Sequence, residues 1–537
     1  MRISISRSAG AVAAVMAMTL SVTACSGSVS SSDKSSNESG ANATNCGTLK
    51  MAFNFDMQVP DPDVFYQADG LNVTQGAYEG LLRYKPNAEP PQIEPALAES
   101  YQVSDDGLKY TFKLRQGVKF QDGTDFNAQA MIDSFARRTA VNAGPAYMVS
   151  YIVKSEARDP YTLVLHLKKP NNAFLDLLAS PYGPKAVSPA AIKANTVGKD
   201  EAQKWLSTHS AGTGPYEISS FKPGAYELTR FDDYWGTGAF VPACYEKVDV
   251  KIIPDFTTQA LQLESGGLDI MTHGIAQNDL ERFKSKGFEV FRTYGTNFVQ
   301  MHLNTHDGPF ADAAVRAAVP AALDRKSIVS EVWGDGAQVA KHIFPTGGMP
   351  DDLGTYDVNH DPSKLRKAVD AGGWSDATVD LAYTTDDPVN AQLAGLIAAQ
   401  LTDAGLKTTA RGVTQPATFD YPSKPGNRPD ALVLPASPDA VQPWAWSSLF
   451  FEPTGGLAYF SPEVCGEGDR LMNDALTKLD PMQATDGFAA SAKAYQDCGA
   501  FVPIADVAET VVGAAGMSGF EHESDSLWAL RLASLRK

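Results

Sequence analysis

Residues 107–128 read GLKYTFKLRQGVKFQDGTDFNA, and this stretch contains signals for a strand, a turn and the start of a helix. Tyr110, Phe112 and Leu114 alternate with polar side chains, which predicts a strand with one buried face. Two glycines follow at turn positions, and Asn127 is a suitable N-cap for the next helix. The stretch therefore predicts a fold that mixes strands and helices.

The same two periodicities recur along the chain. Alternating apolar residues predict strands at residues 48–55, 161–167, 216–221, 226–231, 248–253 and 298–304. Apolar residues spaced for one face predict helices at residues 74–82, 173–178, 257–265 and 311–322. After residue 360, helices at 362–371, 389–404, 469–479 and 485–497 alternate with strands at 379–384, 407–412 and 431–434. This late region is predicted to form an α/β domain of its own.

The composition is that of an ordinary folded protein, with 43% hydrophobic and 20% charged residues. A chain of 537 residues is long enough for roughly two to four structural units. The net charge of −18 argues against nucleic acid or an anionic membrane surface as the main partner.

The N-terminus has the pattern of an export signal. Arg2 and Arg7 precede an apolar run at residues 9–20, and small residues lead up to Cys25. A small residue directly before a cysteine resembles the bacterial lipobox, so we expect a signal peptide at residues 1–24 and a lipid on Cys25. The alternative is an uncleaved anchor, although the run is short for a membrane span. The Ser-rich segment up to residue 45 is expected to be a flexible tether.

Four further cysteines remain if Cys25 carries a lipid: Cys46, Cys244, Cys465 and Cys498. An even number in an exported chain indicates two disulfides, and the sequence alone allows three connectivities. We favour Cys46 with Cys244, which ties the entry strand to a distant segment, and Cys465 with Cys498, which joins two C-terminal helices. The spacings fit no zinc site.

Residues 431–451 read ALVLPASPDAVQPWAWSSLFF, and Asp439 is the only charged residue among them. Three prolines interrupt the stretch too often for a helix. One interpretation is a loop capped by Asp439, with Trp444 and Trp446 in the core. The other is a pocket in which Asp439 receives the positive charge of a ligand beside aromatic walls, because a buried acid needs a partner.

Catalytic and metal-binding patterns give no alternative of similar weight. The sequence has no P-loop, no complete dinucleotide fingerprint and no Gly-x-Ser-x-Gly elbow. His302 and His306 are four apart at the end of a predicted strand, roughly 13 Å along it, which is too far for one metal. We therefore expect a binding protein without enzymatic activity, cofactor or metal.

Several segments together resemble the family 5 extracellular solute-binding proteins, which are receptors of ABC importers for oligopeptides and dipeptides. These segments are residues 79–84 with 95–101, the stretch 107–128, residues 212–216 with 234–236, and residues 304–336. They occur in the family order and cover essentially the whole chain after the tether.

The resemblance implies a mixed α/β fold of two lobes that close on a ligand by a hinge, plus an extra domain. Lobe I would combine residues 46–82, 205–296 and 502–537. The extra domain would be residues 83–204, and the second lobe residues 297–501. The chain would cross between the lobes near residues 294–297 and 500–503, and closure would be a ligand-driven population shift.

The resemblance also implies a site. In the peptide receptors, an Asp in a comparable segment pairs with the ligand's α-ammonium group, and Asp439 falls on that position. Extended segments at residues 54–58 and 435–437 would bind the peptide backbone. The expected ligand contacts are Asn54, Phe55, Met57, Tyr147, Asn297, Phe298, Ser437, Asp439, Trp444 and Trp446. The family's tryptophan shortly before this Asp is absent, and whether Trp444 and Trp446 replace it in the pocket or lie in the core stays open.

The expected function is that of a monomeric, lipid-anchored receptor outside the bacterial cytoplasmic membrane. It would bind an oligopeptide between two lobes and deliver it to ABC permease subunits, touching the membrane only through its anchor. A receptor for an oligosaccharide or another small solute is the first alternative. An exported hydrolase is the second, and a sensor that signals to a membrane partner is a third.

Overall fold

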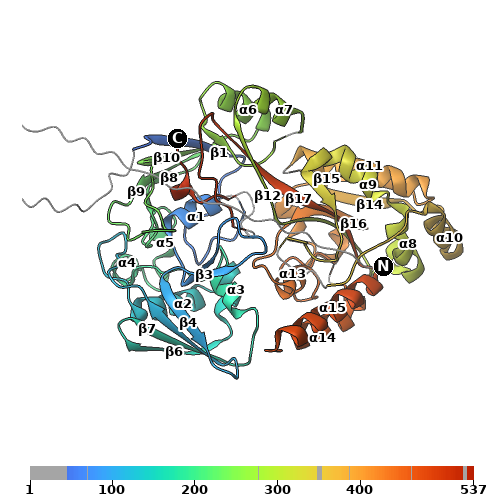
Figure 1. Ribbon diagram of the computed structural model, residues 1–537. Coiled ribbons are helices and arrows are strands. Elements are labelled where there is room, and N and C mark those ends of the chain that lie inside the picture. The colour runs from blue at the N-terminus through green and yellow to red at the C-terminus, as the bar shows by residue number, and fades with distance from the viewer. Residues whose placement is uncertain are drawn as a thin grey trace, which may run out of the picture. The chain divides into compact units, whose positions relative to one another are not determined.

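Two long antiparallel strands, β12 (Glu289–Leu303) and β17 (Phe501–Gly513), lie side by side in the largest sheet (Figure 1). The computed structural model describes residues 45–68, 70–275, 277–347, 353–385, 387–460, 462–523 and 529–537. The predicted signal peptide, Cys25 and nearly all of the predicted tether lie outside these residues. None of the helices in the described ranges is long and apolar enough to cross a membrane.

This sheet has seven strands and mixes both orientations. The path runs β11 (Ile270–Met271), β17, β12, β16 (Ala431–Ala436), β14 (Val379–Thr384) and β15 (Thr408–Val413), while β13 (Ala337–Val339) pairs with β17. Helices α8 (Ala313–Ala322), α9 (Arg325–Trp333), α10 (Pro362–Gly372) and α11 (Pro388–Asp403) share its apolar core. Because β14 is parallel to both β15 and β16, the predicted late α/β arrangement is confirmed.

A four-stranded sheet contains the entry strand. Its order is β1 (Thr48–Phe53), β10 (Lys247–Ile252), β9 (Ala225–Arg230) and β8 (Tyr216–Lys222). Near it lie α1 (Leu71–Ala77), α6 (Phe256–Glu264) and α7 (Gln277–Ser285). The helix predicted at residues 74–82 was wrong in its second half, since α1 ends at Ala77. The chain turns extended there and buries the Glu79 carboxylate, which accepts hydrogen bonds from Thr213, Tyr234 and Trp235.

The stretch at residues 107–128 contributes one strand to a second four-stranded sheet. Its strands are β4 (Ala98–Val103), β5 (Lys109–Leu114), β7 (Thr162–Leu167) and β6 (Ile152–Asp159), in that order. Asn127 caps α2 (Ala128–Val141), as predicted, because its side chain accepts a 3.0 Å hydrogen bond from the Ala130 N–H. The short elements nearby are β2 (Leu82–Tyr84), β3 (Ile93–Pro95), α3 (Phe174–Ala179), α4 (Pro189–Asn195) and α5 (Gln203–Leu206).

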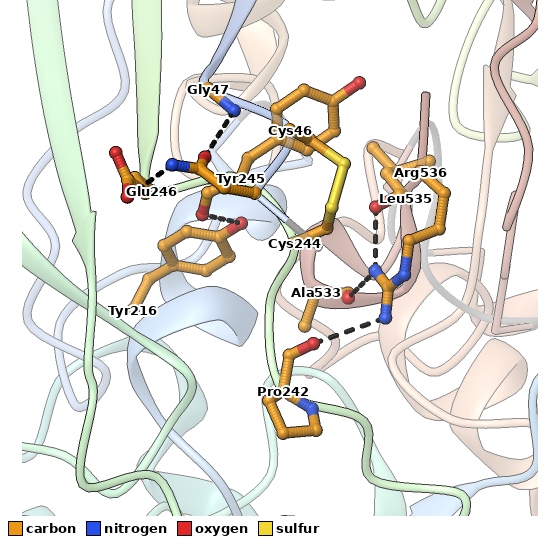
Figure 2. Close-up of a disulfide and its surroundings, with 11 residues drawn as sticks. Cys46, Gly47, Tyr216, Pro242, Cys244, Tyr245, Glu246, Ala533, Leu535 and Arg536 are labelled. Carbon is orange, nitrogen blue, oxygen red and sulfur yellow. Dashed lines mark hydrogen bonds between the residues drawn. A yellow bond between two sulfur atoms is a disulfide. The ribbon is translucent and has the colours of Figure 1, made fainter. Parts of the chain in front are cut away.

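Both expected disulfides are present. Cys465 and Cys498, with Cα atoms 5.3 Å apart, join the residue before α14 (Gly466–Ala475) to the last residue of α15 (Pro481–Cys498). Figure 2 shows Cys46 bound to Cys244, which ties the residues before β1 to those before β10. Beside this disulfide the Arg536 guanidinium donates to the Pro242 carbonyl oxygen at 3.2 Å, so the chain end is fastened to the same segment.

The stretch 431–451 corrects one expectation. It forms β16, a loop and the helix α13 (Pro443–Phe450), although its three prolines argued against any helix. Pro443 occupies the first helical turn, where a missing N–H leaves no intrahelical bond unmade. The remaining helix, α12 (Gln415–Thr418), is a single short turn.

The pairing of β12 with β17 is irregular close to one of the expected crossing points between the lobes. Tyr294 pairs with Ala508 and Phe298 with Asp506, with an irregularity between the two pairs. Val502 pairs instead with Met301, well beyond that irregularity. The predicted crossings at residues 294–297 and 500–503 are therefore not opposite each other in the strand register, and the lobe boundaries stay a prediction.

Candidate ligand-binding site

Asp439 is a buried carboxylate in the loop between β16 and α13, and 4% of its surface is exposed. The Tyr147 hydroxyl donates a 2.5 Å hydrogen bond to its Oδ2 atom, and the Tyr66 hydroxyl donates to the same oxygen. Burial raises the pKa of Asp439 to about 6, and the two hydrogen bonds oppose that rise. Within the described part of the chain, no cationic side chain pairs with it. The site therefore has one negative charge compensated only by hydroxyl groups.

Tyr66 reaches Asp439 because the segment before it is fixed by buried ion pairs. The Arg137 guanidinium on α2 pairs with Asp61 at 2.6 Å and with Asp63 at 2.5 Å. Arg138, also on α2, pairs with Asp63 at 2.7 Å. These side chains are almost completely buried, so the pairs hold the segment in one position.

Tyr147 comes from the 3-10 helix Gly144–Val149, which packs beside Tyr66. A Cβ atom at Gly144 would lie 2.7 Å from the Tyr66 ring, so the two segments can approach this closely only because residue 144 is glycine. Tyr182 packs edge-on against Tyr66, with ring centroids 5.2 Å apart. Two distant segments, those of Tyr66 and Tyr147, thus meet the loop that carries Asp439.

Next to Asp439, the end of β16 has one edge to which a peptide strand can add. Its pairing with β14 stops at Tyr383 and Val433, whereas its pairing with β12 continues to Phe298 and Ala436. In the described strand pairs, residues 434–436 therefore have a partner on one edge only. The Ser437 and Thr296 hydroxyl groups share a 2.5 Å hydrogen bond on the β12 side.

A cavity of about 110 Å³ is lined in part by residues of β12, β16 and β17, and the described residues that line it do not include Asp439. Its lining includes Pro435 of β16, Asn297 of β12, His273, Trp333 and Asp387. Asn297 is 5% exposed, and its Oδ1 atom is buried with no hydrogen-bond partner in the described part of the chain. An unpaired buried amide oxygen is costly, so it favours a ligand donor at this point.

Three aromatic residues expected at the ligand lie in the core. Trp446 is fully buried and packs edge-on against Phe298, with ring centroids 5.3 Å apart. Trp444 is 7% exposed and packs edge-on against Tyr151. Trp446 and Phe298 thus touch apolar neighbours in the interior, and Trp444 lies in the same cluster, so the burial of all three favours the core position over the pocket position.

Among the expected ligand contacts after β1, one is buried in the core and two are half-buried. Met57 is buried in the core of the sheet that contains β1 and donates its backbone N–H to the Tyr226 hydroxyl oxygen at 3.0 Å. Asn54 and Phe55 are half-buried, and the Asn54 side-chain oxygen lies 3.3 Å from the His273 ring. Since His273 lines the cavity, Asn54 lies next to it.

Tyr66 is a member of the site that sequence reasoning missed. It follows a Pro-Asp-Pro-Asp segment, and nothing in the spacing of that segment indicates a binding residue. Its position at Asp439 depends on the ion pairs between that segment and α2. One of the two histidines considered as metal ligands, His302, lies in an apolar environment. His302 is buried, burial lowers its pKa to about 3, and its ring packs on Tyr459 and Phe501. No group of three or more potential ligands for a metal occurs in the described ranges.

Residues 92–457 match the profile of the bacterial extracellular solute-binding proteins, family 5 middle region. The chain belongs to this family. As the match implies, it is an extracellular solute-binding protein. Its relatives are solute-binding receptors rather than enzymes.

Two curated relatives and one solved structure illustrate the likeness. The probable D,D-dipeptide-binding periplasmic protein DdpA of Escherichia coli (strain K12) is 26% identical over 457 residues, covering 83% of this chain and 86% of that protein. The glutathione-binding protein GsiB of Shigella dysenteriae serotype 1 (strain Sd197) is 27% identical over 485 residues, covering 86% and 90%. The dipeptide-binding protein of Pseudoalteromonas sp. SM9913 in complex with Met-Leu has a TM-score of 0.79, 20% identity and coverage of 91% and 100%. At that identity the structural likeness shows the fold alone, and it confirms the predicted mixed α/β binding-protein fold.

Proposed function

We propose that the receptor binds an oligopeptide through its N-terminal ammonium group, with Asp439 as the anchor. The observation that carries this proposal is the Asp439 carboxylate, which is buried at the meeting point of three segments and compensated only by tyrosine hydroxyl groups in the described residues. A desolvated ammonium group provides the missing charge and three N–H donors. Its hydrogen bonds to an ionised carboxylate are stronger than those between neutral groups.

The backbone of such a peptide would run along residues 434–436, whose free edge can form main-chain hydrogen bonds. Asn297, which lines the cavity, and Asn54, which lies near the cavity-lining His273, would contact the ligand, and Ser437 would contact it just beyond the end of β16. The oligosaccharide alternative is weakened, because the indole of Trp446 is enclosed in the core and offers no face to a sugar.

Calorimetric titration with di- to hexapeptides tests the proposal. Peptides with a free N-terminus are expected to bind, and their N-acetylated counterparts are expected to bind at least tenfold more weakly. Equal affinity for both forms would contradict the role of Asp439. Binding of an oligosaccharide in place of any peptide would support the alternative receptor class.

We also propose that Cys25 carries a lipid that anchors the receptor outside the cytoplasmic membrane, with the protein acting as a monomer. Intact-mass measurement of the membrane-extracted protein is expected to show a lipid on an N-terminal cysteine. A Cys25→Ala variant that stays in the membrane fraction would contradict this anchor.

A further inference from the structure

The loop that carries Asp439 is held from a second side by residues around α3. The Ser180 hydroxyl donates a hydrogen bond to the Asp439 carbonyl oxygen, and both groups are buried. The Val441 N–H donates to the Tyr84 hydroxyl oxygen at 2.9 Å. Tyr84 in turn donates its own hydroxyl hydrogen to Asp176 Oδ1 at 2.8 Å. Asp176 on α3 therefore lies two hydrogen bonds away from the backbone of the anchor loop.

Asp176 also contacts the loop directly, through Gln442. The Gln442 side chain donates a hydrogen bond to the Asp176 carboxylate, while its own Oε1 atom is buried with no hydrogen-bond partner among the described residues. A carboxyl group that carries a proton has an O–H donor that an ionised carboxylate lacks. A proton on Asp176 would therefore give the Gln442 oxygen the donor it needs.

Among the described residues, no charged side chain is a cause of the raised pKa of Asp176. Burial raises its pKa to about 7, against the opposing hydrogen bonds from Tyr84 and Gln442. The charged residues of the neighbouring strands β2 and β3 are Arg83 and Glu94, which pair with each other at 2.6 Å. Lys185 donates to the Ser180 carbonyl oxygen at 2.9 Å, and no charged side chain contributes to the shift of Asp176.

We propose that Asp176 is a positioning residue for the Asp439 anchor, and that docking of residues 439–442 on α3 binds a proton at the Asp176 carboxyl group. The proton comes from the solvent and forms the carboxyl O–H bond. The proposal rests on the proposed function, because the docked loop is the one that presents Asp439 to an ammonium group. Its consequence is that acid favours the docked loop, whereas acid disfavours the ionised Asp439 itself.

The two carboxyl groups give opposite pH dependences. Docking raises the pKa of Asp176, so its contribution to ligand affinity is present at low pH and is lost as pH rises through about 7. Asp439 must be ionised to bind an ammonium group, so its contribution is lost as pH falls through about 6. A substitution that removes only the first titration separates them.

Asp176→Asn is that substitution, since the amide accepts from Tyr84 and donates to the Gln442 oxygen at every pH. The experiment measures affinity at pH 5.5, 6.5 and 7.5 by calorimetry, with the tightest-binding peptide of an alanine series from di- to hexapeptide. The ratio of wild-type to Asp176→Asn affinity is expected to fall at least fivefold from pH 5.5 to 7.5. Asp133→Asn, an exposed carboxylate on α2, is the matched control and is expected to leave the wild-type profile unchanged.

Parallel profiles for the wild type and Asp176→Asn would overturn the inference. If N-acetylation still weakens binding in that case, the proposed function stands and only the role of Asp176 fails. If acetylation has no effect, or no peptide binds, the proposed function fails and the inference fails with it. Melting of the ligand-free protein gives an independent check: Asp176→Asn is expected to gain stability relative to the wild type from pH 5 to pH 8, and an unchanged difference would contradict the proton on Asp176.

Discussion

The hydroxyl group of Tyr147 donates a 2.5 Å hydrogen bond to the carboxylate of Asp439, which lies 292 residues further along the chain. This contact joins a 3-10 helix after α2 to the loop after β16, and the Tyr66 hydroxyl joins the same oxygen from a third segment. A carboxylate that is desolvated in this way costs free energy unless a cation reaches it. This arrangement and the contacts that hold it determine how substitutions at Asp439, Trp446 and Arg137 are expected to act.

Asp439→Asn is expected to alter stability in a pH-dependent way. The folded-state pKa of about 6 lies above the ordinary value of 3.8, so the stability that Asp439 contributes in acid is lost as pH rises through about 6. A difference of that size corresponds to about 3 kcal/mol. The unfolding free energy of the variant, relative to the wild type, should therefore rise by about that amount from pH 3.5 to pH 7. A constant difference would show that Asp439 is not desolvated.

Trp446→Ala should reduce stability without changing ligand affinity. The indole is fully buried against Phe298 and Phe450, and removing a buried tryptophan side chain costs about 3–5 kcal/mol. Denaturant unfolding measures the loss, and peptide titration of the folded variant measures affinity. Trp205→Ala is the control, because that ring is half-exposed and stacks on His209, so a smaller loss is expected. A large loss of affinity with little loss of stability would instead indicate that Trp446 contacts the ligand.

Arg137→Ala should destabilise the protein strongly. It leaves Asp61 and Asp63 buried with one partner fewer, and breaking a buried ion pair from one side costs about 3–5 kcal/mol. The loss should be smaller at low pH, where the carboxylates take up protons. Arg158→Ala, an exposed arginine, should change the unfolding free energy by less than about 0.5 kcal/mol. Similar effects of the two substitutions would contradict the ion network.

The Cys465–Cys498 disulfide should stabilise the C-terminal helices. It closes a loop with a sequence separation of 33, for which loop entropy predicts about 3 to 4 kcal/mol. The double variant Cys465→Ser with Cys498→Ser should therefore unfold at lower denaturant concentration than the wild type. Peptide affinity in the absence of denaturant should stay within about twofold, because neither cysteine lies at the Asp439 site.

Local signals predicted much of the fold. The alternation at Tyr110 to Leu114 and the cap at Asn127 became β5 and the start of α2, since both depend on neighbours in the sequence. The prediction that the helix continues past Ala77 was wrong, because tertiary hydrogen bonds to Glu79 determine the backbone there more strongly than the apolar spacing does. The prolines before α13 misled because their effect depends on position, and Pro443 stands at the one turn where proline is tolerated.

The site was predictable only where a chemical type stood out. Asp439 was recognisable as a lone acid in an apolar stretch, and the structure buries it as that pattern implies. Tyr66 and Asp176 carried no such signal, because their relation to Asp439 depends on contacts between segments far apart in sequence. Trp446 and Met57 were indistinguishable from pocket residues by type, and only packing shows that they are enclosed.

The most direct test of the account compares Asp439→Asn with the wild type for one peptide in its free and N-acetylated forms, at pH 7. The wild type should bind the free form, and Asp439→Asn should bind it more weakly by about 1–3 kcal/mol, the range for a hydrogen bond to a charged group. The acetylated form should show no such difference between the two proteins. Asp420→Asn, an exposed carboxylate of the same predicted lobe, should bind like the wild type. Equal losses for the free and acetylated peptides, or no loss for either, would contradict Asp439 as the ammonium anchor.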